Sequence, residues 1–174
     1  MAIFFQGHED PSAGPLAGKG YLTRINLDAD VAHRVTLMAD EASDGLALPL
    51  IDGSTWDPFA KRLLLTSEAA DKGGVWQATL DVPSAAEDIS GVTGRGGYEG
   101  IQTDSAGNLW IVEDIGGAAK SGTTGKQPNS FVSTLTAAKG SSPEVAAYSG
   151  HSLRELAAVA AGDGRLRFQT TLAV

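Results

Sequence analysis

The sequence of 174 residues contains no cysteine. Disulfide bonds, thiolate metal ligands and a cysteine nucleophile are therefore excluded. Basic residues are scarce as well, because 13 lysines and arginines stand against 21 acidic residues and leave a net charge of −8. A protein that binds nucleic acid needs a basic stripe for the phosphates, so we expect no nucleic-acid partner. The excess of acidic residues is compatible with cation binding, although in most proteins such residues simply form a solvated surface.

Long apolar runs are also missing. No stretch approaches the ~20 apolar residues that a membrane-spanning helix requires, so no membrane span is predicted. Near the start only three large apolar residues stand in a row, Ile3, Phe4 and Phe5, and no basic region precedes them. This pattern does not fit a signal peptide.

The chain is rich in turn residues, with 22 glycines and seven prolines between short runs of Thr, Val and Leu. This composition predicts an all-β protein. The clearest hairpin has strands Tyr98 to Thr103 and Asn108 to Val112, closed by the tight turn Asp104 to Gly107.

Acidic residues stand at the open end of this predicted hairpin, namely Glu99 near the entry and Glu113 with Asp114 at the exit. Because a hairpin returns to its starting edge, we expect these carboxylates to converge on one rim. Convergent carboxylates are the ligands that a hard cation needs.

A similar pattern occurs earlier, where Trp56 to Glu68 runs from a strand end through an Asp turn into an apolar strand and a terminal acid. Leu63 precedes Leu109 by 46 residues, and Val75 to Leu80 resembles Ser130 to Leu135 as a further strand. A strand repeat of this period is typical of propeller blades. A β-sandwich with two similar hairpins is the alternative.

A closed propeller has at least four blades, and blades of this period would exceed 174 residues. The sequence therefore predicts a partial β-propeller-like stack of two to three antiparallel blades. We expect an N-terminal loop or arm over residues 1–20, the blade region over 21–136, and a truncated Ala/Gly-rich segment over 137–174. Within that segment, the capping-box pattern of Ser152 and Glu155 predicts a short helix through Ala161, and a last strand is predicted over Arg165 to Val174.

The glycine-rich stretch Gly94-Arg95-Gly96-Gly97 offers bare amides and one guanidinium, which suit an anion. It lacks the Lys-Ser/Thr of a nucleotide-binding P-loop, so a flexible connector between blades is the favoured interpretation. Arg95 is retained as an auxiliary anion contact.

The phrases FFQGHED, GYLTRINLD, DGSTWDPFAKRLLLTSE, YEGIQTDSAGNLWIVEDIGG and PNSF together resemble the PhoX-type bacterial alkaline phosphatases, secreted or periplasmic β-propeller proteins. The resemblance runs from about Phe4 to Phe131. It implies hydrolysis of phosphate monoesters at a calcium- and iron-dependent site in the propeller channel, with a phosphorylated small molecule as substrate. The iron-ligating cysteine of that family has no counterpart here, so calcium is the metal that we expect.

Carried over to this sequence, the resemblance implies catalytic roles for Glu68 and Glu99. Arg95, from the glycine-rich stretch, completes the predicted catalytic set as the auxiliary anion contact. It implies metal ligands in the following order of strength: Glu68, then Glu99 and Glu113 with its neighbour Asp114, then His8 and Glu9. It also implies a periplasmic or secreted location.

Two functions remain open from the sequence. The first is a metal-dependent phosphomonoesterase, and the second is a non-catalytic propeller piece or calcium-stabilised module that self-associates through open blade edges. A serine triad is disfavoured because the three histidines lie in dissimilar contexts and no Gly-x-Ser-x-Gly elbow occurs.

Overall fold

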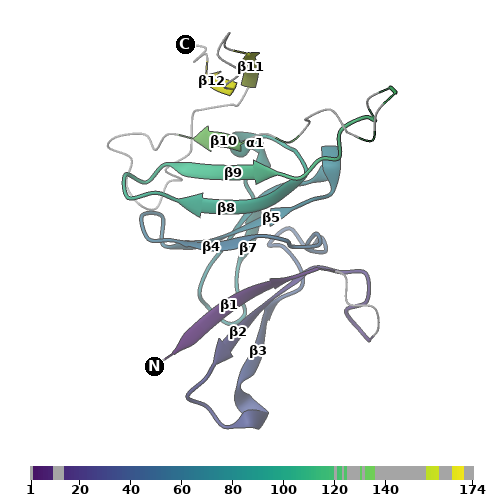
Figure 1. The fold of residues 1–174 in the computed structure, drawn as a ribbon. Helices are drawn as coiled ribbons and strands as arrows, with labels where there is room; N and C mark the ends of the chain where they lie inside the picture. The colour runs from purple at the N-terminus through teal and green to yellow at the C-terminus, as the bar shows by residue number, and fades with distance from the viewer. Residues whose placement is uncertain are drawn as a thin grey trace.

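The computed structural model describes residues 2–9, 14–119, 121–122, 124, 130 and 132–135, together with the backbone of two strands at 156–160 and 166–170. The fold is all-β, as predicted, and consists of antiparallel sheets arranged as a partial, propeller-like stack (Figure 1). Among the described residues the helices are short: η1 (Val31–His33), η2 (Ala70–Lys72) and α1 (Ser90–Thr93). In the described part of the chain, no helix has the length and apolar character needed to cross a membrane.

Three sheets follow one another along the chain. The first sheet contains β1 (Ile3–His8), β2 (Tyr21–Asn26) and β3 (Val35–Ala39) in that order. The second sheet has four strands in chain order: β4 (Ser54–Asp57), β5 (Arg62–Ser67), β6 (Gly74–Ala78) and β7 (Ala86–Asp88). The third sheet contains β8 (Tyr98–Thr103), β9 (Leu109–Glu113) and β10 (Val132–Leu135), and a separate hairpin pairs β11 (Leu156–Ala160) with β12 (Leu166–Thr170).

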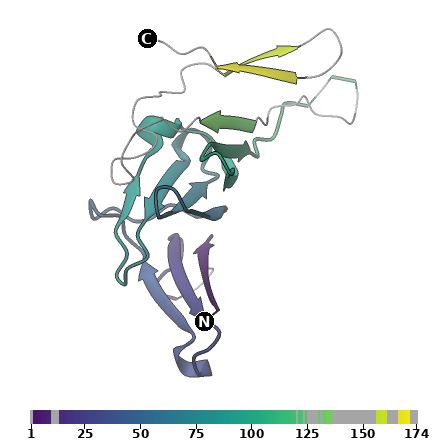
Figure 2. The same cartoon turned by 90° about the vertical axis from the view of Figure 1, so that its left-hand side faces the viewer.

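The second sheet is the middle layer, because β5 is buried on both of its faces (Figure 2). Successive residues of a strand point to opposite faces of the sheet. Leu63 and Leu65 accordingly pack in an apolar cluster with residues of the first sheet such as Leu22. Leu64 packs on the other side, in a cluster with Leu109 and other residues of the third sheet. The continuous apolar run of β5 is thus explained by a strand that has no solvent-facing side.

The predicted repeat is present as two antiparallel hairpins, β4–β5 and β8–β9. Asp57 and Asp104 each accept a backbone hydrogen bond from the residue two positions later, at 2.9 Å from Phe59 N and 2.8 Å from Ala106 N. These side chains fold the backbone into a turn in the way that Asx residues commonly do. The side chain of Asp104 also accepts hydrogen bonds from Asn108 and from the indole of Trp110, and these bonds lower the pKa of Asp104 to about 2.

The third strands of the repeat correspond, but with a different alignment from the one predicted. The ladders place Leu63 opposite Ala78 and Leu109 opposite Leu135, so Ala78 is the counterpart of Leu135. The predicted alignment of Val75 to Leu80 with Ser130 to Leu135, which matches Leu80 with Leu135, is wrong by two residues. Pairing register is set by which residues a sheet must bury, and the pattern of neighbouring apolar residues alone did not fix it.

The ends of the chain also differ from prediction. Residues 3–8 form β1 and pair with β2 instead of lying in a free arm. The helix predicted through Ala161 is wrong over Leu156–Ala160, which is β11 and pairs with β12 inside the predicted last strand. Alanine has the highest intrinsic helix propensity, but propensity is a weak preference that tertiary context overrides, and here a strand partner satisfies the same backbone groups. Ser152, Glu155 and Ala161 lie outside the described residues.

The turn of the β4–β5 hairpin contains Lys61 at a φ of 53°, the left-handed region that favours glycine. Its counterpart in the β8–β9 hairpin is Gly107, at a φ of 84°. A residue with a Cβ pays about 1–2 kcal/mol in this conformation. We therefore predict that Lys61→Gly raises the free energy of unfolding by about 1 kcal/mol, measured by urea denaturation. Lys61→Ala, which removes the same charge but keeps Cβ, is the control, and an equal gain in both variants would contradict the prediction.

Candidate metal site

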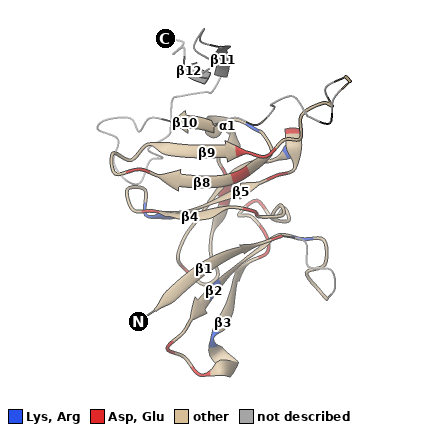
Figure 3. Ribbon diagram, viewed as in Figure 1, with Lys and Arg blue, Asp and Glu red and all other residues tan. Residues whose placement is uncertain are grey.

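Five carboxylates from all three sheets gather at one end of the stack. Glu68 follows β5 directly, and the other four come from the start or end of neighbouring strands or from within β8. We call these residues the carboxylate cluster: Glu9, Asp52, Glu68, Glu99 and Asp114. Red segments of the first, second and third sheets meet there in Figure 3.

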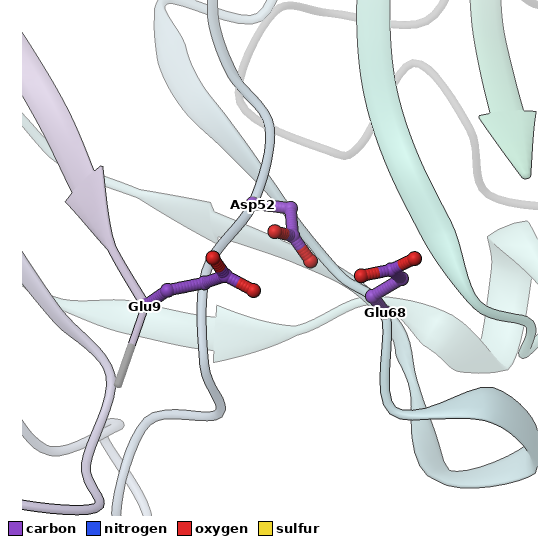
Figure 4. A group of neighbouring side chains, drawn as sticks. All are labelled: Glu9, Asp52 and Glu68. Carbon is purple, nitrogen blue, oxygen red and sulfur yellow. The ribbon is translucent and has the colours of Figure 1, made fainter. Parts of the chain in front are cut away.

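The cluster consists of two overlapping groups. Glu9, Asp52 and Glu68 each offer a carboxylate oxygen within 4.8 Å of the others, and their side chains point toward one another in Figure 4. Glu68, Glu99 and Asp114 satisfy the same criterion. Glu68 is therefore common to both groups.

Thr66, one residue inside the end of β5, holds the neighbouring segments in place. Its hydroxyl accepts a hydrogen bond from Gly53 N at 2.9 Å and donates one to the carbonyl of Glu99 at 3.2 Å. Its carbonyl accepts from Asp52 N at 3.0 Å. Gly53 is required here, because a Cβ on it would lie 2.5 Å from both the Glu99 carbonyl and the Thr66 hydroxyl. Through these hydrogen bonds Thr66 holds both Asp52 and Glu99 near the end of β5.

The cluster is electrostatically unfavourable when it is fully ionised. Asp52 Oδ2 is buried without a hydrogen-bond donor, since its neighbours are also carboxylates. Desolvation, followed by a hydrogen bond to Glu9 when Asp52 is protonated and by the charges of nearby glutamates, raises the pKa of Asp52 to about 7. Desolvation and then the charges of Glu99, Asp114 and Glu9 also raise the pKa of Glu68. Both shifts have the sign expected when like charges are forced together.

The donor set fits a hard divalent cation. Calcium takes 6–8 oxygen ligands at about 2.4 Å, so ligands on opposite sides of the ion lie about 4.8 Å apart. Three carboxylate oxygens within 4.8 Å of one another can therefore contact a single ion. A cation at this position would also provide the positive partner that the buried oxygen of Asp52 lacks.

Four of the predicted metal ligands, Glu68, Glu99, Asp114 and Glu9, lie in the carboxylate cluster. The prediction missed Asp52, which follows Pro49 in a segment without regular structure. The Asp-Gly pair before a strand was its only local signal. Its position depends on the backbone bonds to Thr66, which connect residues far apart in the sequence.

Glu113 and His8 do not belong to either group of the described carboxylates. Glu113 lies beside Gly96 and Tyr98, where burial and then its charge raise the pKa of the Tyr98 phenol to about 12. His8 stacks on Tyr21 with ring centroids 4.1 Å apart, and its Nε2 lies 2.8 Å from the Thr23 hydroxyl. In each case the neighbouring residue, Asp114 or Glu9, reaches the cluster, as expected where successive residues point in opposite directions.

Arg95 is engaged elsewhere in the fold. Its guanidinium donates to Asp88 Oδ2 at 2.7 Å and to the Lys72 carbonyl at 3.2 Å. The adjacent Gly96 is closely packed, because a Cβ on it would lie 2.6 Å from the Tyr98 ring. The stretch predicted to be a flexible connector is thus a packed corner that directly follows α1 and carries the ion pair of Arg95 with Asp88.

No protein-family model matches this sequence, and neither the curated proteins nor the solved structures contain a match to it. The site is therefore interpreted from its own geometry and from the sequence resemblance described above.

The raised pKa of Asp52 gives a pH dependence of defined sign. The folded chain holds this proton up to about pH 7, whereas an unfolded aspartate releases it near pH 3.9. Between these values the folded state binds more protons, so stability falls as the pH rises. We predict that, in chelator, the melting temperature decreases from pH 4.5 to 8, and that Asp52→Asn makes this decrease smaller. Glu87→Gln, outside the cluster, should keep the original slope, and an unchanged slope in Asp52→Asn would refute the assignment.

Proposed function

We propose that this chain binds a calcium-like divalent cation at the carboxylate cluster, and that the occupied site belongs to a metal-dependent hydrolase of phosphate monoesters. The observation that carries the proposal is the position of Glu68, which is shared by two carboxylate groups at the junction of three sheets. The sequence resemblance to PhoX-type phosphatases supplies the reaction class, and by the same resemblance we propose a periplasmic or secreted location.

The charge of the cluster explains why a phosphate substrate would need the cation. Without a counter-ion, the ionised carboxylates of the cluster would repel a phosphate dianion. A bound cation would polarise a phosphoryl oxygen and offset the charge that develops as the ester bond breaks. Glu9, Glu99 and Asp114 are exposed, so one side of the cluster is open to a small phosphorylated molecule. The donors are all oxygen atoms, which favours calcium over metals that prefer sulfur or nitrogen.

A non-catalytic, cation-stabilised module is the second candidate. It is favoured by the pairing of Arg95 with Asp88, which occupies the guanidinium that was expected to contact the substrate. Because the cluster draws ligands from three sheets, a cation there would hold the sheets together without any turnover. The two candidates share the cation site and differ in hydrolysis.

Calcium binding tests the site that both candidates share. A ligand that binds only the folded state stabilises it by about 2.7 kcal/mol at about a hundredfold excess over its dissociation constant. We predict a calcium-dependent rise in melting temperature that Glu68→Gln abolishes, because this substitution removes a ligand from both groups. Glu87→Gln removes the same charge outside the cluster and should keep the rise.

The adjacent acids at the end of β9 provide a finer comparison. Asp114→Asn should weaken calcium binding at least about tenfold, since even indirect partners of a bound metal contribute that much. Glu113→Gln should leave the calcium affinity unchanged, as measured by titration calorimetry. Equal melting temperatures in calcium and in chelator for the unmodified chain would eliminate the cation site and both candidate functions.

Hydrolysis of a chromogenic phosphate monoester separates the two candidates. If the chain is a phosphatase, we expect slow calcium-dependent turnover that is lost in Glu68→Gln and kept in Glu87→Gln. The rate should be far below that of a complete propeller enzyme, because phosphoryl transfer requires several fixed donors and small misplacements are costly. Calcium binding without turnover would reject the hydrolase and leave the non-catalytic module.

A further inference from the structure

A cleft of about 210 Å³ lies between the first and second sheets, where β1 and β4 contact one another. Its lining residues are all among those that the structure describes, and none of them is acidic or basic. They come mainly from these two strands: Ile3, Phe4, Phe5, Ser54, Thr55, Trp56 and Leu63. The cleft is therefore separate from the carboxylate cluster in composition and in charge.

The cleft continues the apolar cluster that joins the two sheets. Leu63 is almost fully buried in that cluster, and Phe5 packs against it. Trp56 is opposite Leu63 in the β4–β5 ladder, and residues opposite one another lie on the same face of a sheet. The side chain of Trp56 therefore faces the first sheet, as that of Leu63 does.

The apolar walls of the cleft are only partly covered by the protein. Trp56 is 40% exposed, although its face of the sheet leads into the apolar cluster. Ile3 and Phe5 are two positions apart in β1, so they share a face, and both are half-buried. A ligand in the cleft would remove apolar surface of both sheets from water at once, which favours binding.

The fold holds the two walls at a fixed separation. β1 is paired with β2, and β4 is paired with β5, along the residues that line the cleft. Beside the cleft, Ile51 N donates to the His8 carbonyl at 3.1 Å, and the Ile51 side chain is buried in the apolar cluster. The cleft is thus formed before a ligand arrives, as small-molecule sites usually are.

The size and the chemistry of the lining define the class of ligand. An apolar cavity of about 150 Å³ can hold benzene, so this cleft has room for one aromatic ring system. Trp56 offers a flat surface on which such a ring can stack. The polar lining consists of Ser54 and Thr55, and the Thr55 hydroxyl already donates to Gln102 Oε1 at 3.2 Å. A sugar ring would need more hydrogen-bond partners than these residues supply.

We propose that this cleft is a binding site for a small neutral aromatic compound, which stacks on Trp56 with the Ser54 hydroxyl as its polar contact at the rim. The proposal does not depend on the phosphatase function, because no lining residue belongs to the carboxylate cluster. Binding accordingly requires no cation.

Indole is the probe, and it is titrated into the isotope-labelled chain while NMR follows the side-chain N–H signals of the three tryptophans. We expect the signals of Trp56 and of the amides in β1 and β4 to shift. Trp56→Ala should weaken indole binding about tenfold, because the aromatic contact accounts for a factor of that order. Trp110→Ala is the matched control, since Trp110 is 44% exposed but lies in β9 of the third sheet. It should keep the affinity.

A second variant fills the cleft instead of emptying it. Ser54 is exposed and is opposite Leu65, so its side chain lies on the same face as Trp56. Ser54→Leu should therefore block indole without disturbing the core, and circular dichroism checks that each variant is folded. Glu68→Gln and added chelator should leave indole binding unchanged, which separates this site from the cation site.

Three results would overturn the proposal. The first is a Trp56 signal that does not shift at millimolar indole, and the second is equal weakening by Trp110→Ala. The third is unchanged affinity in the folded Ser54→Leu variant. Cyclohexanol and glucose test the ligand class, and we expect both to bind more weakly than indole. Equal or tighter binding of either compound would reject an aromatic site in favour of one for a saturated ring or a sugar.

Discussion

The burial of β5 on both faces is the constraint on which the rest of the structure depends. Leu63 and Leu65 need the first sheet to cover them, and Leu64 needs the third. A strand in this position fixes three layers at once, because neither neighbouring sheet can shift without exposing a leucine to water. Each layer then ends near the same point as β5, where the strand reaches Glu68. The carboxylate cluster is a consequence of this layering.

The cluster illustrates the conflict between a stable fold and a candidate metal site. Charges of one sign are held together by Thr66 and Gly53, whose contacts leave Asp52 partly desolvated beside other acids. Groups that are unfavourable by themselves and convergent in space are characteristic of sites that await a ligand. The same packing that stabilises the middle sheet therefore positions the groups that destabilise its end. A cation would resolve the conflict by neutralising the repulsion.

Local patterns accounted for the hairpins and for part of the site. Asp57 and Asp104 form their turns through hydrogen bonds to residues two positions away, which a short stretch of sequence encodes. Glu68 directly follows an apolar strand, so its position at the end of that strand followed from the same stretch. The choice between Glu113 and Asp114 did not follow, because it depends on which face of β9 meets the cluster. The helix predicted over Leu156–Ala160 failed for a related reason, since a distant strand supplied the partner.

By itself, the sequence determined the all-β class, the period of the strand repeat and the acidic character of one rim, since turn chemistry, alternation and charge are properties of neighbouring residues. Only the tertiary structure decided that Asp52 joins Glu68, that Arg95 is bound to Asp88, and that His8 turns toward Tyr21 and Thr23. The contacts of Asp52 and of His8 join segments far apart in the sequence, and the contact of Arg95 with Asp88 depends on how the packed corner after α1 orients one side chain. Such contacts arise when sheets pack, because the burial of apolar faces sets the relative positions of strands, and those positions select which polar groups meet.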